Sequence, residues 1–187
     1  MKRLFLTLFA GCLLAAAASA QTIPAGSMFV NPSLTNLSFN AITASVEGEK
    51  ESFSRYGLQA TGGYAIMDDL AVVGGIGFQG GSYDGSGISM LTLFAGARYY
   101  VIPNVYAGAN LTLGTVTVNN KVSTDVDSNL KGNSLGVELN AGYTYFLSSK
   151  VAIEPSLSYN LGLSTKVQDT AINLSVFSLN IGFLILL

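Results

Sequence analysis

Apolar and polar residues alternate along most of this chain. In the closing stretch from Phe177 to Leu187, every second side chain is large and apolar, and the residues between them begin with Ser178, Asn180 and Gly182. Alternation of this kind predicts a β-strand with one apolar face. Because a long apolar strand exposed to water would aggregate, this face has to be covered by protein or by lipid.

The same alternation runs from residue 28 to the end of the chain. In the first segment the apolar positions change from even to odd numbers, which predicts a β-bulge near Thr35 and Asn36. We expect eight strands, and their ranges are 28–41, 53–66, 70–82, 87–101, 105–119, 133–147, 151–165 and 172–187.

Short and long connections alternate between these segments. The short ones are 67–69, 102–104 and 148–150, and the longer polar ones are 43–52, 80–86, 119–132 and 166–171. Antiparallel strands of even number, with short turns at one end and long loops at the other, are typical of a transmembrane β-barrel. A soluble up-and-down barrel of the lipocalin type also has eight strands, so strand number alone leaves both architectures open.

The composition of the two strand faces favours the membrane. Charged residues make up 11% of the chain, against about 25% in ordinary soluble domains. The polar faces carry only four of them, Arg55, Arg98, Glu138 and Glu154. These would be too few for the surface of a soluble barrel, but inside a membrane barrel their charges balance. We therefore predict an eight-stranded antiparallel up-and-down transmembrane β-barrel whose interior charge network pairs Arg98 with Glu154 and Arg55 with Glu138.

Aromatic residues support this orientation and limit the width of the lumen. On the apolar faces they gather in two belts, with Tyr64, Tyr99, Tyr143 and Tyr145 near the short turns and Tyr56, Phe39 and Phe78 towards the long loops. On the inward faces lie Phe94, Tyr100, Tyr106 and Phe146. Since an eight-stranded barrel is just wide enough for its side chains to fill, we expect no wide pore.

The first twenty residues have the form of a secretion signal. Lys2 and Arg3 precede an apolar stretch that ends in Ala18-Ser19-Ala20, which predicts cleavage before Gln21 and a barrel domain over residues 21–187. The sole cysteine, Cys12, lies within this signal, so an intrachain disulfide is excluded; the sequence does not decide whether it is lipidated. The mature chain would carry seven basic and eleven acidic residues, and this balance does not suggest binding to nucleic acid.

With these features the chain resembles the small outer-membrane β-barrel proteins, the porin-family or OmpA-like eight-stranded barrels. The resemblance covers about residues 26–187 and rests on the signal, the eight strands, Ala97-Arg98-Tyr99-Tyr100 and the closing apolar stripe. It implies a place in the cell outer membrane after secretion to the periplasm, with outer-membrane lipid and the barrel assembly machinery as partners. Such families usually end on an aromatic residue, whereas this chain ends on Leu187 with Phe183 four residues earlier.

Nothing in the sequence forms a convincing catalytic, metal or cofactor site. Histidine is absent, so activation of an inward serine such as Ser156 would need Glu138 or Glu154, and interior ion pairs are the better interpretation of both. The GxGxxG match at 75–80 lies inside a predicted strand with no helix after it. The calcium-like stretch at 125–129 lacks the required Gly and Glu at its sixth and twelfth positions.

The sequence therefore predicts a protein that is not an enzyme and that has a structural role or an extracellular ligand bound by its long loops. Two alternatives stay open at this point. The first is a narrow channel for ions or small solutes, and the second is a soluble secreted barrel that binds an apolar ligand.

Overall fold

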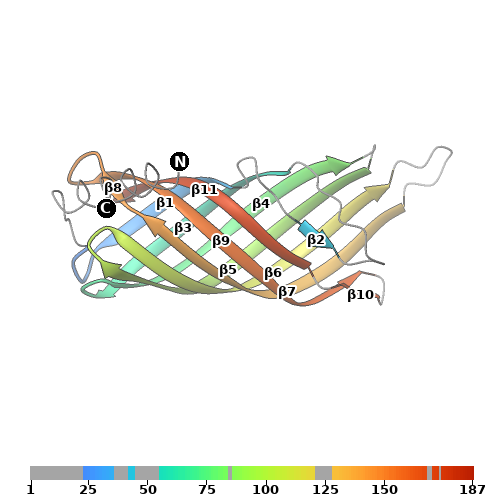
Figure 1. The fold of residues 1–187 in the computed structure, drawn as a ribbon, viewed down its shortest axis with the longest axis horizontal. Helices are drawn as coiled ribbons and strands as arrows, with labels where there is room; N and C mark the ends of the chain where they lie inside the picture. Colours follow the sequence, from blue (N-terminus) through green and yellow to red (C-terminus); the bar gives the residue numbers. More distant parts are fainter. Residues whose placement is uncertain are drawn as a thin grey trace, which may run out of the picture.

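The structure is a computed structural model, and it describes residues 23–35, 42–44, 55–83, 86–120, 128–167, 170–172 and 174–187. In this part of the chain, eight long tilted strands follow one another around a cylinder (Figure 1). They are β1 Met28–Thr35, β3 Arg55–Met67, β4 Leu70–Tyr83, β5 Ser86–Ile102, β6 Val105–Asn120, β7 Ser128–Tyr143, β9 Val151–Val167 and β11 Leu174–Leu186. Across the same residues, no helix has the length and apolar character needed to cross a membrane.

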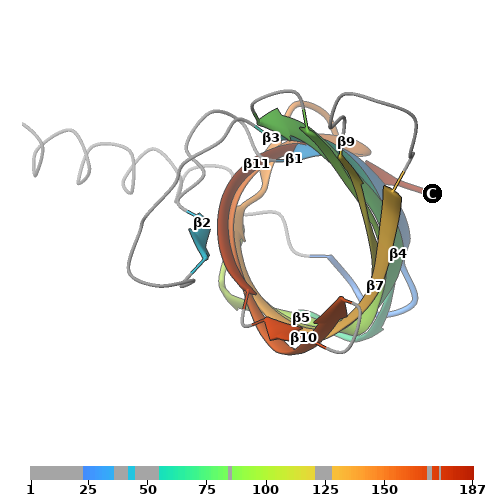
Figure 2. The same cartoon turned by 90° about the vertical axis from the view of Figure 1, so that its right-hand side faces the viewer.

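The sheet closes on itself. Each long strand pairs antiparallel with the next, and β11 pairs back with β1, from Phe29↔Leu186 to Leu34↔Ile181. The view along the barrel in Figure 2 shows the resulting ring. Three short pieces extend it: β2 Ile42–Ala44 pairs with β11, while β8 Tyr145–Phe146 and β10 Thr170–Ile172 pair with β9. The predicted eight-stranded antiparallel barrel is confirmed.

The first and sixth predicted strands differ from the observed ones. The stretch 133–147 is interrupted at Thr144, whose backbone N–H donates to the Asn104 carbonyl at 2.7 Å instead of continuing the strand. Strand β1 ends at Thr35, the last described residue of this segment, so the bulge predicted near Thr35 and Asn36 lies outside the described residues.

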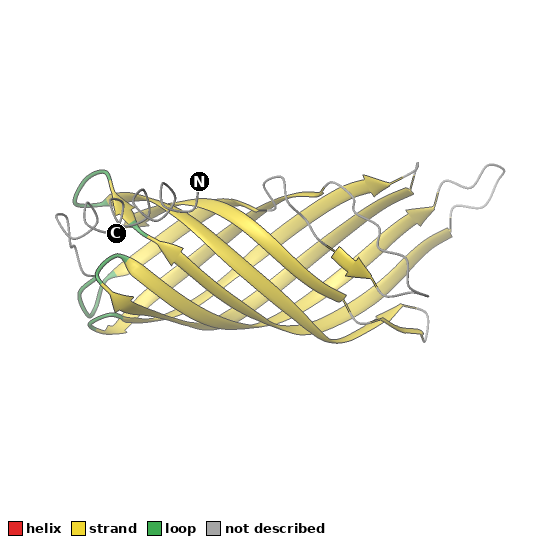
Figure 3. Ribbon diagram, in the orientation of Figure 1, coloured by secondary structure: helices red, strands yellow, loops and turns green. Residues whose placement is uncertain are grey.

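The short connections β3–β4, β5–β6 and β7–β9 lie at one end of the barrel, where Figure 3 draws green loops. Asp69 and Asn104 end two of these turns with φ values of 66° and 68°, in the left-handed region that Asp and Asn tolerate better than most residues. The strands before them shift register between Ala65 and Met67 and between Tyr100 and Ile102. A left-handed residue beside such a bulge is a standard hairpin connection, so these sequences close their turns locally.

The apolar faces point away from the barrel axis. In β11, Phe177, Ile181 and Phe183 are exposed, while Ser178 and Asn180 are buried. The predicted belts follow this pattern, since Tyr64, Tyr99, Tyr145, Tyr56 and Phe78 are exposed and Tyr143 is half-buried; Phe39 lies outside the described residues. A soluble carrier of apolar ligands would need its apolar faces inside, so that alternative is wrong.

The interior has an apolar region as well as a polar one. Near the short turns, inward-facing residues form one apolar cluster, whose buried members are Ile23, Phe29, Ala65, Ala71, Val73, Tyr100, Tyr106, Ala152 and Leu184. Phe146 and Leu186 pack against it. Polar side chains begin above this layer, so the lumen has an apolar floor beneath a polar middle section.

Candidate functional site

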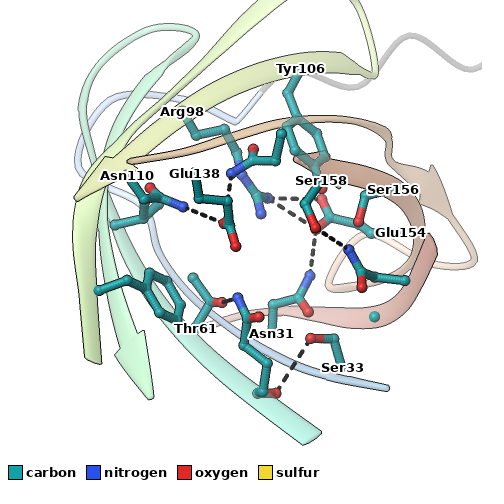
Figure 4. A pocket seen from close by; sticks show the side chains of 16 residues that line it. Asn31, Ser33, Thr61, Arg98, Tyr106, Asn110, Glu138, Glu154, Ser156 and Ser158 are labelled. Carbon is teal, nitrogen blue, oxygen red and sulfur yellow. Dashed lines mark hydrogen bonds and ion pairs between the residues drawn. The ribbon is translucent and has the colours of Figure 1, made fainter. Parts of the chain in front are cut away.

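The charged group nearest the apolar floor is an ion pair that crosses the lumen. Arg98 of β5 and Glu154 of β9 face the barrel axis from different walls (Figure 4). The Arg98 Nη1 atom lies 2.9 Å from Glu154 Oε2 and 3.1 Å from Oε1, and both residues are buried. The structure therefore brings together the first of the two charge pairs expected from the sequence.

Other strands complete the surroundings of Glu154. Thr144 donates its hydroxyl to Glu154 Oε1 at 2.5 Å, Asn31 of β1 donates its amide to Oε2, and the Tyr100 hydroxyl lies 3.5 Å from Oε1. A buried carboxylate is tolerated when charge and hydrogen bonds compensate its lost hydration, and Glu154 has both. Because the donors come from β1, β5 and the β7–β8 junction, this one residue links several parts of the wall.

Aromatic rings cover the guanidinium of Arg98. Its Cζ atom lies 3.9 Å from the centroid of the Tyr106 ring and 5.3 Å from that of Phe29. The Tyr100 and Tyr106 rings are 5.8 Å apart and tilted by 59°. A cation over an aromatic face is favourable, and the rings also occupy the space beside the ion pair. Tyr100 and Tyr106 are buried, so these predicted inward aromatics do fill the lower lumen.

Glu138 of β7 forms a separate polar group higher in the lumen. Its Oε1 atom accepts hydrogen bonds from the side-chain amides of Asn110 at 2.9 Å and Asn140 at 3.3 Å. The backbone of Arg55 pairs with that of Gly81, but its side chain lies outside the described part of the structure. The pairing of Arg55 with Glu138 stays a prediction, and the amide partners of Glu138 were missed.

Large inward side chains lie over glycines of the neighbouring strand. Phe94 pairs with Gly75, where an added Cβ would lie 2.5 Å from the Phe94 ring. Tyr106 pairs with Gly142, where an added Cβ would lie 2.6 Å from the Tyr106 ring. Without that carbon, each ring can lie flat against the wall. The same relation holds for Asn110 over Gly96, Asn140 over Gly108 and Asn31 over Gly182. The inward glycines therefore make room for specific neighbouring side chains.

The space left between these side chains is small. One cavity of about 40 Å³ lies among Arg98, Glu138 and Glu154, and a second of about 40 Å³ extends from Glu138 towards Thr92 and Asn160. Each has room for a few water molecules. Hydrogen bonds from Asn160 to Thr112 and from Asn180 to Ser158 cross between strands at the upper level.

The weaker sequence motifs are placed as follows. Ser156 lines the lower cavity, but the neighbouring Glu154 is engaged by Arg98 and Thr144 and so is poorly placed as a base. The glycines of 75–80 lie within β4, as expected. Most of the stretch 125–129 falls outside the described residues. Among those residues, no three His, Cys, Asp or Glu side chains cluster to hold a metal ion.

Comparison with solved structures places this barrel among small outer-membrane proteins. Neisserial surface protein A has 19% sequence identity and a TM-score of 0.66, with 84% of this chain and 96% of that chain covered. Ail, the attachment invasion locus protein of Yersinia pestis, has 13% identity and a TM-score of 0.56, over 86% and 99% of the two chains. OprG of Pseudomonas aeruginosa has 16% identity and a TM-score of 0.54, over 90% and 99%. At these identities the likeness concerns the fold.

The sequence comparison defines the family. No curated protein matches the chain by sequence. The profile of the outer membrane protein beta-barrel domain matches residues 6–183, which is nearly the whole chain. The outward apolar faces, the closed ring of eight strands and this match agree on a location in the cell outer membrane. This chain belongs to the family of the outer membrane protein beta-barrel domain.

Proposed function

We propose that this protein is a closed membrane scaffold that holds its long loops at the outer surface and does not serve as a wide pore. The observation that carries the proposal is the filled cross-section around Arg98 and Glu154, where the ion pair, Asn31, Thr144 and the Tyr106 ring meet. Ions that pass this level would have to break a buried charge pair, which is costly. Catalysis has no comparable support, because Glu154 is already hydrogen-bonded on both oxygens.

The channel alternative has one feature in its favour. Two small neighbouring cavities lie in the lumen, the lower one beside the ion pair, and Glu138 borders both of them. A path through them would still have to pass Arg98 and the apolar floor. Purified protein in planar bilayers should therefore show little conductance, and the double variant Arg98→Ala/Glu154→Ala should stay close to that level, because the apolar floor still closes the path. Steady single-channel currents from the unmodified protein would instead favour the narrow channel.

The long loops are the part of the chain we assign to external contacts. Rigid scaffolds commonly carry function on their loops. Ail, which shares the fold, has been crystallised with sucrose octasulfate, a heparin analogue. In the present chain the long connections hold more acidic than basic residues: Glu47, Glu49, Glu51, Asp84, Asp125, Asp127 and Asp169 against Lys50 and Lys121, while Lys131 and Lys166 lie in the adjoining ends of β7 and β9. This balance disfavours a polyanion and favours a cationic or neutral partner.

A binding assay can separate these partner classes. Proteoliposomes would be passed over immobilised heparin and over immobilised polylysine at increasing salt. We expect salt-sensitive retention on polylysine that weakens when Glu47, Glu49 and Glu51 are changed to Gln, and no retention on heparin. Binding to heparin, or polylysine binding unaffected by these changes, would contradict the assignment.

A further inference from the structure

The segment just before β1 enters the mouth of the barrel at the short-turn end. Ile23 is only 2% exposed and belongs to the same apolar cluster as Ala65, Ala71, Ala152 and Leu184. These four residues come from β3, β4, β9 and β11. Because β1 lies between β3 and β11, and β9 follows β11 in the ring, the cluster joins Ile23 to one continuous arc of the wall that runs from β4 to β9.

Hydrogen bonds hold this segment in a defined shape. The Gly26 N–H donates to the Ala65 carbonyl at 2.8 Å, and the Ala65 N–H donates to the Ser27 carbonyl at 2.9 Å. The Ala25 N–H donates to Asp68 Oδ1 at 2.9 Å, in the adjacent tight turn. Gly26 has a φ of +86°, a conformation that glycine adopts readily, and it lets the chain turn between Ile23 and β1.

We propose that residues 23–27 form a plug that closes the short-turn mouth of the barrel, and that release of Ile23 admits water to the lumen below Arg98. The contacts differ from those of the ion pair, so this closure is a second one in series with it. In barrels of this kind the short turns face the periplasm, and the plug therefore closes the periplasmic side. Cleavage at the predicted site before Gln21 would leave only two residues ahead of Ile23.

Engineered cysteines can test the plug directly, because Cys12 lies in the predicted signal and the mature chain would have no cysteine. Ala152→Cys serves as the reporter, since Ala152 is fully buried in the cluster. Lys150→Cys, in the exposed turn beside it, gives the rate of unhindered labelling. Each protein would be treated with a charged, membrane-impermeant methanethiosulfonate, and folding would be checked by the different gel mobility of boiled and unboiled samples.

We expect the Ala152→Cys reporter to react slowly in the otherwise unmodified protein. Adding Ile23→Ala should raise its labelling rate by about tenfold or more, since the loss of buried aliphatic area favours the open mouth. Asp68→Ala removes only the anchor to Ala25 and should give a smaller increase. Ile66→Ala is the matched control: it is the same change beside the same mouth, but Ile66 faces outward and is 48% exposed. This variant should leave the rate unchanged.

Two results would overturn the plug. One is a reporter at position 152 that reacts as fast as Lys150→Cys without any change at Ile23. The other is a folded Ile23→Ala protein whose reporter remains as slow as in the Ile66→Ala control. Neither result depends on conductance or loop binding, so the plug can fail while the proposed scaffold function stands, and the reverse also holds.

Discussion

Removing one partner of the Arg98–Glu154 pair should destabilise the barrel more than the loss of one ordinary contact. Glu154 is 1% exposed and depends on Arg98 for its counter-charge. Arg98→Ala would leave that carboxylate buried among the neutral donors Asn31 and Thr144. An unpaired buried charge of this kind reduces the free energy of unfolding by about 3–5 kcal/mol. Glu154→Ala should reduce the free energy of unfolding by a similar amount, because it leaves the Arg98 guanidinium without a counter-charge between aromatic rings.

The double variant Arg98→Ala/Glu154→Ala removes both charges at once, so it should cost less than the sum of the single variants. We expect a coupling energy of about 1–3 kcal/mol, within the range known for residues in direct contact. Arg98→Met/Glu154→Leu keeps more of the side-chain volume and should be more stable than the double alanine variant, because less empty space remains.

The assay is urea unfolding of the barrel in lipid vesicles, with the folded fraction read from the gel mobility of unboiled samples. Arg98→Ala combined with Asn160→Ala is the control cycle, because Asn160 is hydrogen-bonded to Thr112 at the upper level of the lumen. The effects of these two substitutions on the free energy of unfolding should be additive within about 0.5 kcal/mol. If the effects of Arg98→Ala and Glu154→Ala are additive to the same degree, the ion pair does not stabilise the fold through a direct interaction.

Two further substitutions test the lumen packing and the membrane orientation. Gly142→Ala places a Cβ 2.6 Å from the Tyr106 ring and should reduce the free energy of unfolding by about 1–3 kcal/mol in the same urea titration. Gly62→Ala is its control and should change the free energy of unfolding little, because the nearest atom to its added Cβ is 3.9 Å away. Leu111→Arg, at an outward position that is 63% exposed, should cost about 2–4 kcal/mol in vesicles, and Ile102→Arg beside a short turn only about 0–1 kcal/mol. If Gly142→Ala and Gly62→Ala reduced the free energy of unfolding equally, the packing of Tyr106 against Gly142 would be contradicted. If Leu111→Arg and Ile102→Arg reduced it equally, the position of the barrel in the bilayer would be contradicted.

Sequence reasoning reached the inward charged residues but not all of their partners. Arg98 and Glu154 were paired because both lie close to a short turn, and the structure joins them. Asn31 and Thr144 also fall on inward positions of their strands, yet nothing local shows that they meet at Glu154. Their meeting depends on how far each strand is staggered against its neighbours around the ring. The amide partners of Glu138 were missed for the same reason.

Strand number, the outward position of the apolar faces and the tight turns were determined by the sequence itself. Strand number follows from period-two alternation, the outward position of the apolar faces from the small number of charged residues on the polar faces, and the tight turns from residues within one turn, such as Asn104, so each can be recognised locally. The tertiary structure alone decided that Ile23 enters the mouth, that Tyr106 lies over Gly142, and that four groups converge on Glu154. Those contacts join residues far apart in the chain, and only the closure and register of the whole barrel bring them within reach.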